Sequence, residues 1–155
     1  MIYFGVKSSK CINESHDDFK VIHDRAKVFI RVDYGIHNAA RSFELQLKYF
    51  LEGSSKLDPR NSNQLKAAKH VITEERPKAE ANDIHIAAKH DGKSLMWNAM
   101  HLTYVASYLI ATADYLYLEG KVSHRLRWGG NWDKDGIINL DQSFIDNPHL
   151  ELYKP

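Results

Sequence analysis

The chain of 155 residues has the size of one ordinary domain, and its 43% content of hydrophobic residues is enough to form a core, which excludes a disordered chain. Its 21 basic and 20 acidic residues leave a formal charge of +1, and no basic stripe stands out, so nucleic acid is not an expected partner. Cys11 is the only cysteine, which excludes an intramolecular disulfide and a cysteine-based zinc cluster.

The first half of the chain predicts helices around one short strand. Residues 14–29 have apolar side chains at three- and four-residue spacing, which predicts a helix. Residues 28–34 are rich in β-branched and aromatic residues and predict a strand. A second helix is expected over residues 39–51 and a polar loop over residues 54–68.

The second half predicts a longer helix between short strands. A charged loop at residues 73–80 precedes a strand at 82–88. Residues 94–118 carry the clearest apolar stripe of the chain and predict a long helix. Two further strands are expected at 123–128 and 148–153. Because helices and strands are segregated, the pattern predicts an α+β fold in which a small antiparallel sheet packs with helices, as a single domain over residues 1–155.

Neither export nor membrane insertion is expected. The first eight residues lack a basic region followed by an apolar run of about 7–15 residues, which a secretory signal requires. The most apolar stretch, residues 102–118, is interrupted by Ser107, Thr112 and Asp114 and is too short to span a bilayer comfortably.

The nine histidines suggest a metal site, although the common zinc motif His-Glu-x-x-His is absent. Catalytic zinc takes three protein ligands, usually imidazole nitrogens and carboxylate oxygens, and keeps a further position for water. His70, Asp83 and His149 are candidates for such a set, and Asp146 is a candidate general base three residues before His149. Spacing alone does not select them, because about one pair spaced like Asp146 and His149 is expected by chance.

Three groups of residues, in chain order, carry a resemblance to a known family. The first group is Val32-Asp33-Tyr34-Gly35, Arg41-Ser42, Gln46 and Gly53-Ser54-Ser55. The second group is Ala68-Lys69-His70 and Ala79-Glu80-Ala81-Asn82-Asp83. The third group is Arg127-Trp128-Gly129-Gly130-Asn131-Trp132 and Asp146-Asn147-Pro148-His149-Leu150-Glu151-Leu152. Together they resemble the zinc peptidases that include D-alanyl-D-alanine carboxypeptidases and dipeptidases, and especially the phage L-alanyl-D-glutamate peptidases.

The resemblance implies the chemistry of a site in a cleft on the sheet. It implies that His70, Asp83 and His149 bind Zn²⁺ and that Asp146 is the catalytic base. It further implies that Arg41 holds a substrate carboxylate and steadies the developing oxyanion, for which a planar guanidinium is suited.

Other residues remain open to two interpretations. Trp128 and Trp132 are expected either to line a substrate-binding wall or to pack in the core. His85, two residues after Asp83, is expected to be structural, or else a spare ligand. The sequence departs from the family at Ala68 and Ala79 and by an insertion at about residues 72–78, which affects the rim of the cleft.

The implied function is that of a phage endolysin. The enzyme would cut the L-Ala–D-Glu bond of the peptidoglycan stem peptide, as a monomer made in the host cytoplasm that reaches the periplasm and cell wall after a holin permeabilises the membrane. Two alternatives stay open. One is a D,D-carboxypeptidase or D-Ala-D-Ala dipeptidase with the same zinc centre. The other is a non-catalytic wall-binding domain with structural zinc, which an extra ligand such as His85 would favour.

Overall fold

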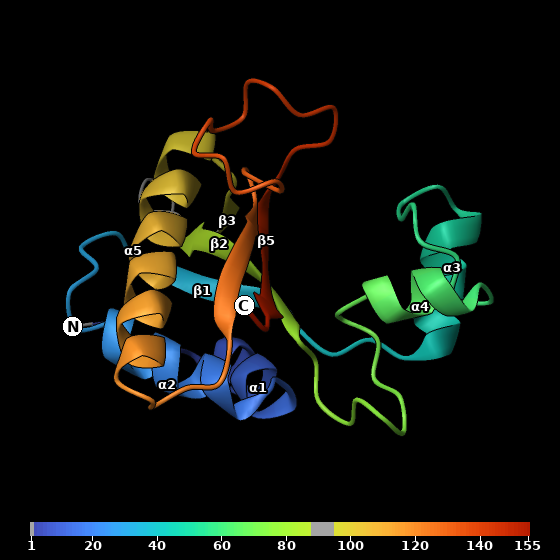
Figure 1. The fold of residues 1–155 in the computed structure, drawn as a ribbon, viewed down its shortest axis with the longest axis horizontal. Coiled ribbons are helices and arrows are strands. Elements are labelled where there is room, and N and C mark those ends of the chain that lie inside the picture. The colour runs from blue at the N-terminus through green and yellow to red at the C-terminus, as the bar shows by residue number, and fades with distance from the viewer. Residues whose placement is uncertain (1, 88–94) are drawn as a thin grey trace.

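The computed structural model describes residues 2–87 and 95–155. Its antiparallel sheet has the strand order β1-β2-β5-β4, and the two-residue β3 pairs with the end of β2 (Figure 1). The strands are β1 Tyr34–Asn38, β2 Ala81–Ala87, β3 Leu95–Met96, β4 Arg125–Gly129 and β5 Asp146–Tyr153. The helices are α1 Val6–Glu14, α2 Asp17–Ala26, α3 Phe43–Leu51, α4 Ser62–Ala67 and α5 Ala99–Leu118. The predicted α+β fold with one small antiparallel sheet is confirmed.

The main core lies between the sheet and the helix α5, which packs along one face of the sheet (Figure 1). The alternating sequence of strand β5 gives the sheet one apolar and one polar face. Leu150 and Leu152 point to the core, while His149 and Glu151 alternate with them and point to the other face. The apolar side chains of the core come from α2, α5 and the strands: Phe19, Ile22, Ile84, Ile86, Leu102, Val105, Leu109, Leu126, Leu150 and Leu152.

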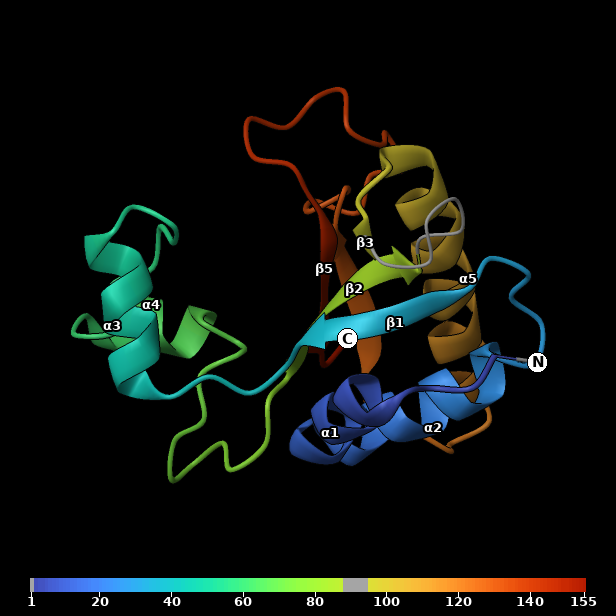
Figure 2. The same ribbon diagram turned by 180° about the vertical axis from the view of Figure 1, so that it is seen from behind.

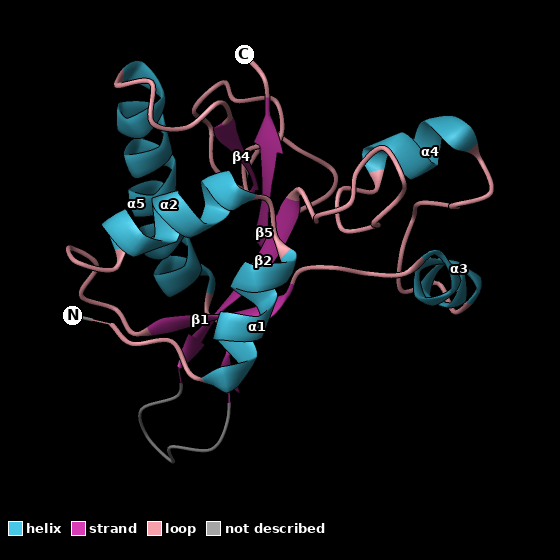
Figure 3. Cartoon of the chain, turned by 90° about the horizontal axis from the view of Figure 1, so that it is seen from below, coloured by secondary structure: helices cyan, strands magenta, loops and turns pink. Residues whose placement is uncertain are grey.

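Helices α3 and α4 form a lobe on the side of the sheet opposite α5 (Figures 1 and 2). Seen from below, the lobe stands apart and is joined to the sheet by extended segments (Figure 3). In the described part of the chain, no residue of α3 or α4 belongs to a hydrophobic core cluster. The lobe is therefore held by polar contacts and by the segments that connect it to the sheet.

The predicted element boundaries were wrong at three places in the first half of the chain. The helix predicted over 14–29 is the shorter α2, and α1 before it was not predicted. The two helices are separated where Ser15 is extended and His16 caps α2 by accepting a hydrogen bond from the backbone N–H of Asp18. The strand predicted over 28–34 is displaced to β1, because pairing with β2 starts only at Tyr34. The polar loop contains α4, which Asn61 caps.

The long helix is shorter than predicted. It begins at Ala99 after the cap residue Asn98, and Leu95 and Met96 form β3 instead of a first helical turn. Met100, an apolar residue within the range predicted for this helix, is 79% exposed. Residue 88, the predicted end of the second strand, and residue 94, the predicted start of the helix, lie outside the described residues. None of the described helices is long and apolar enough to cross a membrane.

A buried polar network lies within the main core around His23. Its Nδ1 lies 3.0 Å from the Tyr34 hydroxyl and its Nε2 lies 3.2 Å from the Asn82 Oδ1. The Asn82 amide nitrogen is committed to Ser15 and Ala81, so Asn82 accepts the proton of the neutral imidazole through Oδ1. Burial lowers the pKa of His23 to about 4, against the opposing effect of the hydrogen bond to Asn82.

This network predicts a loss of stability in acid. The unfolded chain protonates His23 near pH 6.5 and the folded chain only near pH 4, so the unfolded state binds more protons between these values. The free energy of unfolding should fall by about 3 kcal/mol over this interval. Urea unfolding at several pH values, with a chelator present, checks the result. The variant His23→Gln should show a shallower pH dependence than the control His101→Gln, and equal slopes would contradict the assignment.

Candidate metal centre and its cleft

Three side chains converge on the face of the sheet opposite α5. His70, Asp83 and His149 each offer one ligand atom, and the three atoms lie within 4.8 Å of one another. The Asp83 Oδ1 lies 3.1 Å from the His70 Nε2 and 3.1 Å from the His149 Nδ1. The structure thus brings together the three residues that the sequence resemblance put forward as metal ligands.

The sheet register brings two of these residues together from distant parts of the sequence. Asp83 on β2 stands directly opposite His149 on the antiparallel strand β5. His70 lies in the turn after α4, and its backbone oxygen accepts a hydrogen bond from the Arg41 N–H at 2.8 Å. The Ile72 N–H also donates to the Arg41 oxygen at 3.1 Å. These two backbone hydrogen bonds fix the turn that carries His70 to the segment around Arg41, which leads into the lobe.

The outer atoms of the three side chains are also held. The His70 Nδ1 lies 2.6 Å from the Ala39 carbonyl oxygen, so it donates its proton there and leaves Nε2 free as a ligand atom. The His149 Nε2 donates in the same way to Glu151, at 3.2 Å, and leaves Nδ1 free. Asn38 donates to the Asp83 Oδ2 at 3.2 Å and fixes the carboxylate.

The electrostatics of the centre favour a cation. Burial would raise the pKa of Asp83, but the neighbouring His70 and His149 outweigh it and hold the pKa well below its usual range. Burial likewise opposes protonation of His149, yet its hydrogen bonds to Asp83 and Glu151 raise the pKa to about 9. Positive charge is therefore stabilised where the three ligand atoms meet. The donor set of two imidazoles and one carboxylate fits a catalytic zinc ion.

The insertion predicted at residues 72–78 braces the turn that carries His70. Arg76 donates hydrogen bonds to backbone oxygens at the end of α4 and in the following turn, including Ala68 at 2.8 Å and Val71 at 2.9 Å. Further bonds reach Leu65 and Lys66, each at 3.1 Å. The Leu65, Lys66 and Ala68 oxygens lie at the C-terminal end of α4, where a helix leaves carbonyl groups short of partners, so Arg76 caps this end of α4.

A cleft of about 640 Å³ opens beside the three ligand residues, between the lobe and the sheet. On the lobe side it is lined by Arg41, Gln46 and Tyr49, and on the sheet side by Asp146 and Trp132. The cleft therefore contains the proposed base and the proposed carboxylate-binding residue next to the candidate metal ligands.

Arg41 is fixed in the cleft by residues of the lobe. Its Nη1 donates to the Gln46 Oε1 at 2.7 Å, and its guanidinium carbon lies 4.9 Å from the centre of the Tyr49 ring. The buried Gln46 donates in turn to the Ser55 hydroxyl at 2.9 Å and to the Leu57 carbonyl at 2.7 Å. The Arg41 Nε is buried and has no hydrogen-bond partner among the described residues, so its hydrogen-bonding capacity is unused there.

Asp146 occupies the first position of β5, opposite Gly129 on β4. A Cβ atom at position 129 would overlap the backbone carbonyl of Asp146, so only glycine allows the two strands to approach so closely here. Burial, and to a lesser extent the charge of Asp83, raises the pKa of Asp146 against the opposing effect of His149. A carboxylate with a raised pKa is suited to accept and return a proton.

The prediction that Trp128 lines a substrate wall is wrong. Trp128 is 2% exposed and belongs to the main core, and its ring nitrogen donates to the Asn147 carbonyl at 2.7 Å. Because it stands opposite Leu150 in the sheet, it shares the inward face of that residue. Trp132 lines the cleft instead, with its ring centre 5.3 Å from that of His149.

His85 stays outside the group of candidate ligands. Its ring lies against His37 and Trp97, at centroid distances of 6.2 Å in both cases. A sequence-based search also missed the contribution of Glu151, which holds His149. The two-residue spacing of a strand was the available signal, since it places Glu151 on the same face as His149.

Within residues 2–87 and 95–155, two other groups of side chains have a metal-like composition. In the group of His16, Asp18 and His124, the Asp18 Oδ2 already accepts hydrogen bonds from the Ser123 backbone and hydroxyl, at 2.9 and 3.0 Å, and lies 2.8 Å from the His124 Nδ1. The other group consists of three exposed aspartates on the loop between β4 and β5. Neither group lies in the cleft with Arg41 and Asp146.

Comparison with known proteins decides the family. The model of the phage L-alanyl-D-glutamate peptidase family matches residues 1–153. The chain belongs to this family. Among solved structures, the L-Ala D-Glu endopeptidase ChiX of Serratia marcescens has a similar fold, with a TM-score of 0.66 and 16% sequence identity over 99% of this chain and 90% of the other. No curated protein sequence matches the chain. This phage L-alanyl-D-glutamate peptidase therefore shares its fold with an enzyme to which its sequence is only distantly similar.

Proposed function

We propose that the chain is a zinc-dependent endopeptidase that cuts the L-Ala–D-Glu bond of the peptidoglycan stem peptide and serves as a phage endolysin. The observation that carries the proposal is the convergence of His70, Asp83 and His149 in a cleft that also contains Arg41 and Asp146. Membership of the phage L-alanyl-D-glutamate peptidase family supports the identity of the bond.

Each proposed role follows from the position of the side chain. His70, Asp83 and His149 hold the metal, and a bound zinc ion supplies Lewis-acid polarisation of a carbonyl and a water of lowered pKa. Asp146 accepts the proton of the attacking water and returns it to the leaving amine. Arg41 binds a carboxylate of the substrate next to the scissile bond, since Gln46 fixes its guanidinium and no described residue pairs with its Nε.

The cellular setting is part of the same proposal. The enzyme is made in the host cytoplasm and acts as a monomer on the cell wall once a holin has opened the membrane. Neither membrane insertion nor nucleic acid has a role in this scheme.

Mass spectrometry of digested peptidoglycan tests the function. Incubation of purified peptidoglycan with the protein and zinc should release peptides with a new N-terminal D-Glu. A chelator should abolish this product, and added zinc should restore it. Release of D-Ala instead would replace the proposal with a carboxypeptidase, and absence of cleavage by the zinc-loaded protein would refute catalysis.

The close approach of Gly129 to Asp146 predicts a further effect on catalysis. Gly129→Ala should displace Asp146 and lower kcat by roughly 10- to 100-fold, because a displacement of about 1 Å in a catalytic group has effects of this size. Metal content should stay unchanged. Gly5→Ala is the matched control, since nothing lies within 4 Å of a Cβ at that position. Wild-type kcat in the Gly129→Ala variant would contradict the placement of Asp146.

A further inference from the structure

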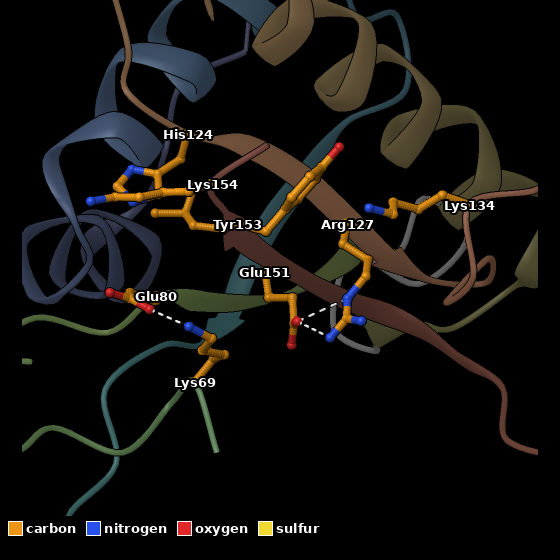
Figure 4. A pocket seen from close by; sticks show the side chains of 9 residues that line it. Lys69, Glu80, His124, Arg127, Lys134, Glu151, Tyr153 and Lys154 are labelled. Atoms are coloured by element: carbon orange, nitrogen blue, oxygen red, sulfur yellow. Dashed lines mark hydrogen bonds and ion pairs between the residues drawn. The ribbon is translucent and has the colours of Figure 1, made fainter. Parts of the chain in front are cut away.

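A second hollow, of about 490 Å³, lies on the same face of the sheet beyond the cleft. Figure 4 shows its side chains, which come from the end of β5, from β4 and the chain on either side of it, and from the segments around residues 69 and 80. Four of them are cationic, namely Lys69, Arg127, Lys134 and Lys154, and two are anionic, Glu80 and Glu151.

The hollow adjoins the cleft that holds the candidate metal ligands. Lys69, Arg127 and Glu151 line both spaces. Strand β5 connects them, because His149, Glu151 and Tyr153 follow one another on the same face at the two-residue period of a strand. One such step measures about 7 Å, which is the length of roughly two residues of an extended peptide. An extended substrate bound at the metal centre would thus reach the hollow within a few residues.

The charges of the hollow leave two cations without an acidic neighbour among its lining residues. Lys69 pairs with Glu80 at 2.6 Å, and Arg127 pairs with Glu151, as the dashed lines in Figure 4 show. Both carboxylates of the lining are thereby engaged. Lys134 lies over the Tyr153 ring, at 4.1 Å from its centre, and Lys154 is exposed at the end of β5. The hollow therefore carries a net positive charge that favours an anionic ligand.

The stem peptide carries its carboxylates on one side of the bond that we propose is cut. On the N-terminal side, L-Ala is joined through a neutral amide to the glycan-linked lactyl group. On the C-terminal side follow the carboxylate of D-Glu and those of the residues after it. Arg41 is the proposed partner of the carboxylate nearest the scissile bond, so the hollow is left for the more distant ones.

We propose that this hollow is the binding subsite for the carboxylate-bearing C-terminal part of the stem peptide, with Lys134 and Lys154 as its specificity-determining residues. This inference rests on the proposed function. It also gives the substrate a direction, in which the C-terminal part runs along β5 from His149 toward Tyr153. The glycan-linked end then lies at the opposite end of the cleft.

Two synthetic substrates and one pair of variants test the subsite. The substrates are N-acetyl-L-Ala-γ-D-Glu-L-Lys-D-Ala with a C-terminal carboxylate and the same peptide with a C-terminal amide. The zinc-loaded wild-type protein should cleave the acid with a kcat/KM about 5- to 10-fold higher than the amide, through a lower KM. The double variant Lys134→Gln/Lys154→Gln should lose this preference by losing activity on the acid alone. Lys121→Gln, an exposed lysine away from the hollow, should behave as wild type.

The possible outcomes separate the subsite from the proposed function. Failure of the zinc-loaded wild-type protein to cut either peptide at the L-Ala–D-Glu bond would overturn the proposed function, and the subsite with it. If the wild-type protein cuts both peptides, then an equal loss on acid and amide in the double variant, or an unchanged preference, would overturn the subsite alone. The preference for the acid should also shrink between 50 and 500 mM salt, because exposed charges are screened. A preference that is insensitive to salt would count against these lysines.

Discussion

Asp146→Asn is expected to lose turnover of peptidoglycan by roughly 10²- to 10⁴-fold while the protein still binds one metal ion. An amide oxygen has the size of the carboxylate oxygen but does not accept the proton of the attacking water. Asp146 is outside the group of ligand atoms formed by His70, Asp83 and His149, so the metal site should remain complete. Release of peptides with N-terminal D-Glu measures turnover, and plasma mass spectrometry measures bound zinc.

Two comparisons make this result specific to the base. Asp114→Asn removes a carboxylate of α5 that does not line the cleft, and it should retain wild-type activity. The thermal midpoint of Asp146→Asn should stay near that of the wild-type protein. Full lytic activity in Asp146→Asn would exclude this residue as the base.

His149→Ala is expected to lose the metal itself. The substitution removes one of three ligand atoms and also frees Glu151 from its hydrogen bond with the imidazole. Loss of an outer partner alone lowers metal affinity by about 10- to 100-fold, so loss of a ligand should exceed that range. Activity should fall with metal content, and competition with a chromophoric chelator measures the affinity.

The matched control is His101→Ala, which removes a histidine at the start of α5 whose ring lies 2.9 Å from the Oδ1 of the cap residue Asn98. It should bind zinc as the wild-type protein does. Together with Asp146→Asn, the two variants separate chemistry from metal binding. An unchanged zinc affinity in His149→Ala would remove this residue from the ligand set.

Local patterns in the sequence predicted the elements that pack against the core and failed where distant contacts decide. The strands β2 and β5 and the helix α5 carry regular apolar spacing, which each segment shows by itself. In contrast, β1 consists of Tyr34-Gly35-Ile36-His37-Asn38, a poor strand sequence that becomes a strand through pairing with β2. The more β-like residues before it include Val28 and Phe29, which are 41% and 50% exposed.

In the candidate site, too, local sequence patterns do not predict what contacts between distant segments determine. No spacing rule connects His70, Asp83 and His149, because the turn after α4 and the register of β2 against β5 bring them together. The sequence pointed to them only through resemblance to a family. The sequence left Trp128 open between a substrate wall and the core, because its face depends on which residue of β5 it pairs with. The bracing of His70 by Arg76 lay in a charged segment that resembled a solvated loop.

The polar attachment of the α3–α4 lobe makes this fold modular. One wall of the cleft comes from a lobe that contributes nothing, among the described residues, to the hydrophobic core clusters. The opposite wall comes from the sheet, whose inner face is the core itself. Sequence change in the lobe, at positions other than those that hold Arg41 and His70, is therefore uncoupled from the stability of the core. Evolution or grafting can reshape the substrate range of such an enzyme there, while the sheet preserves the chemistry.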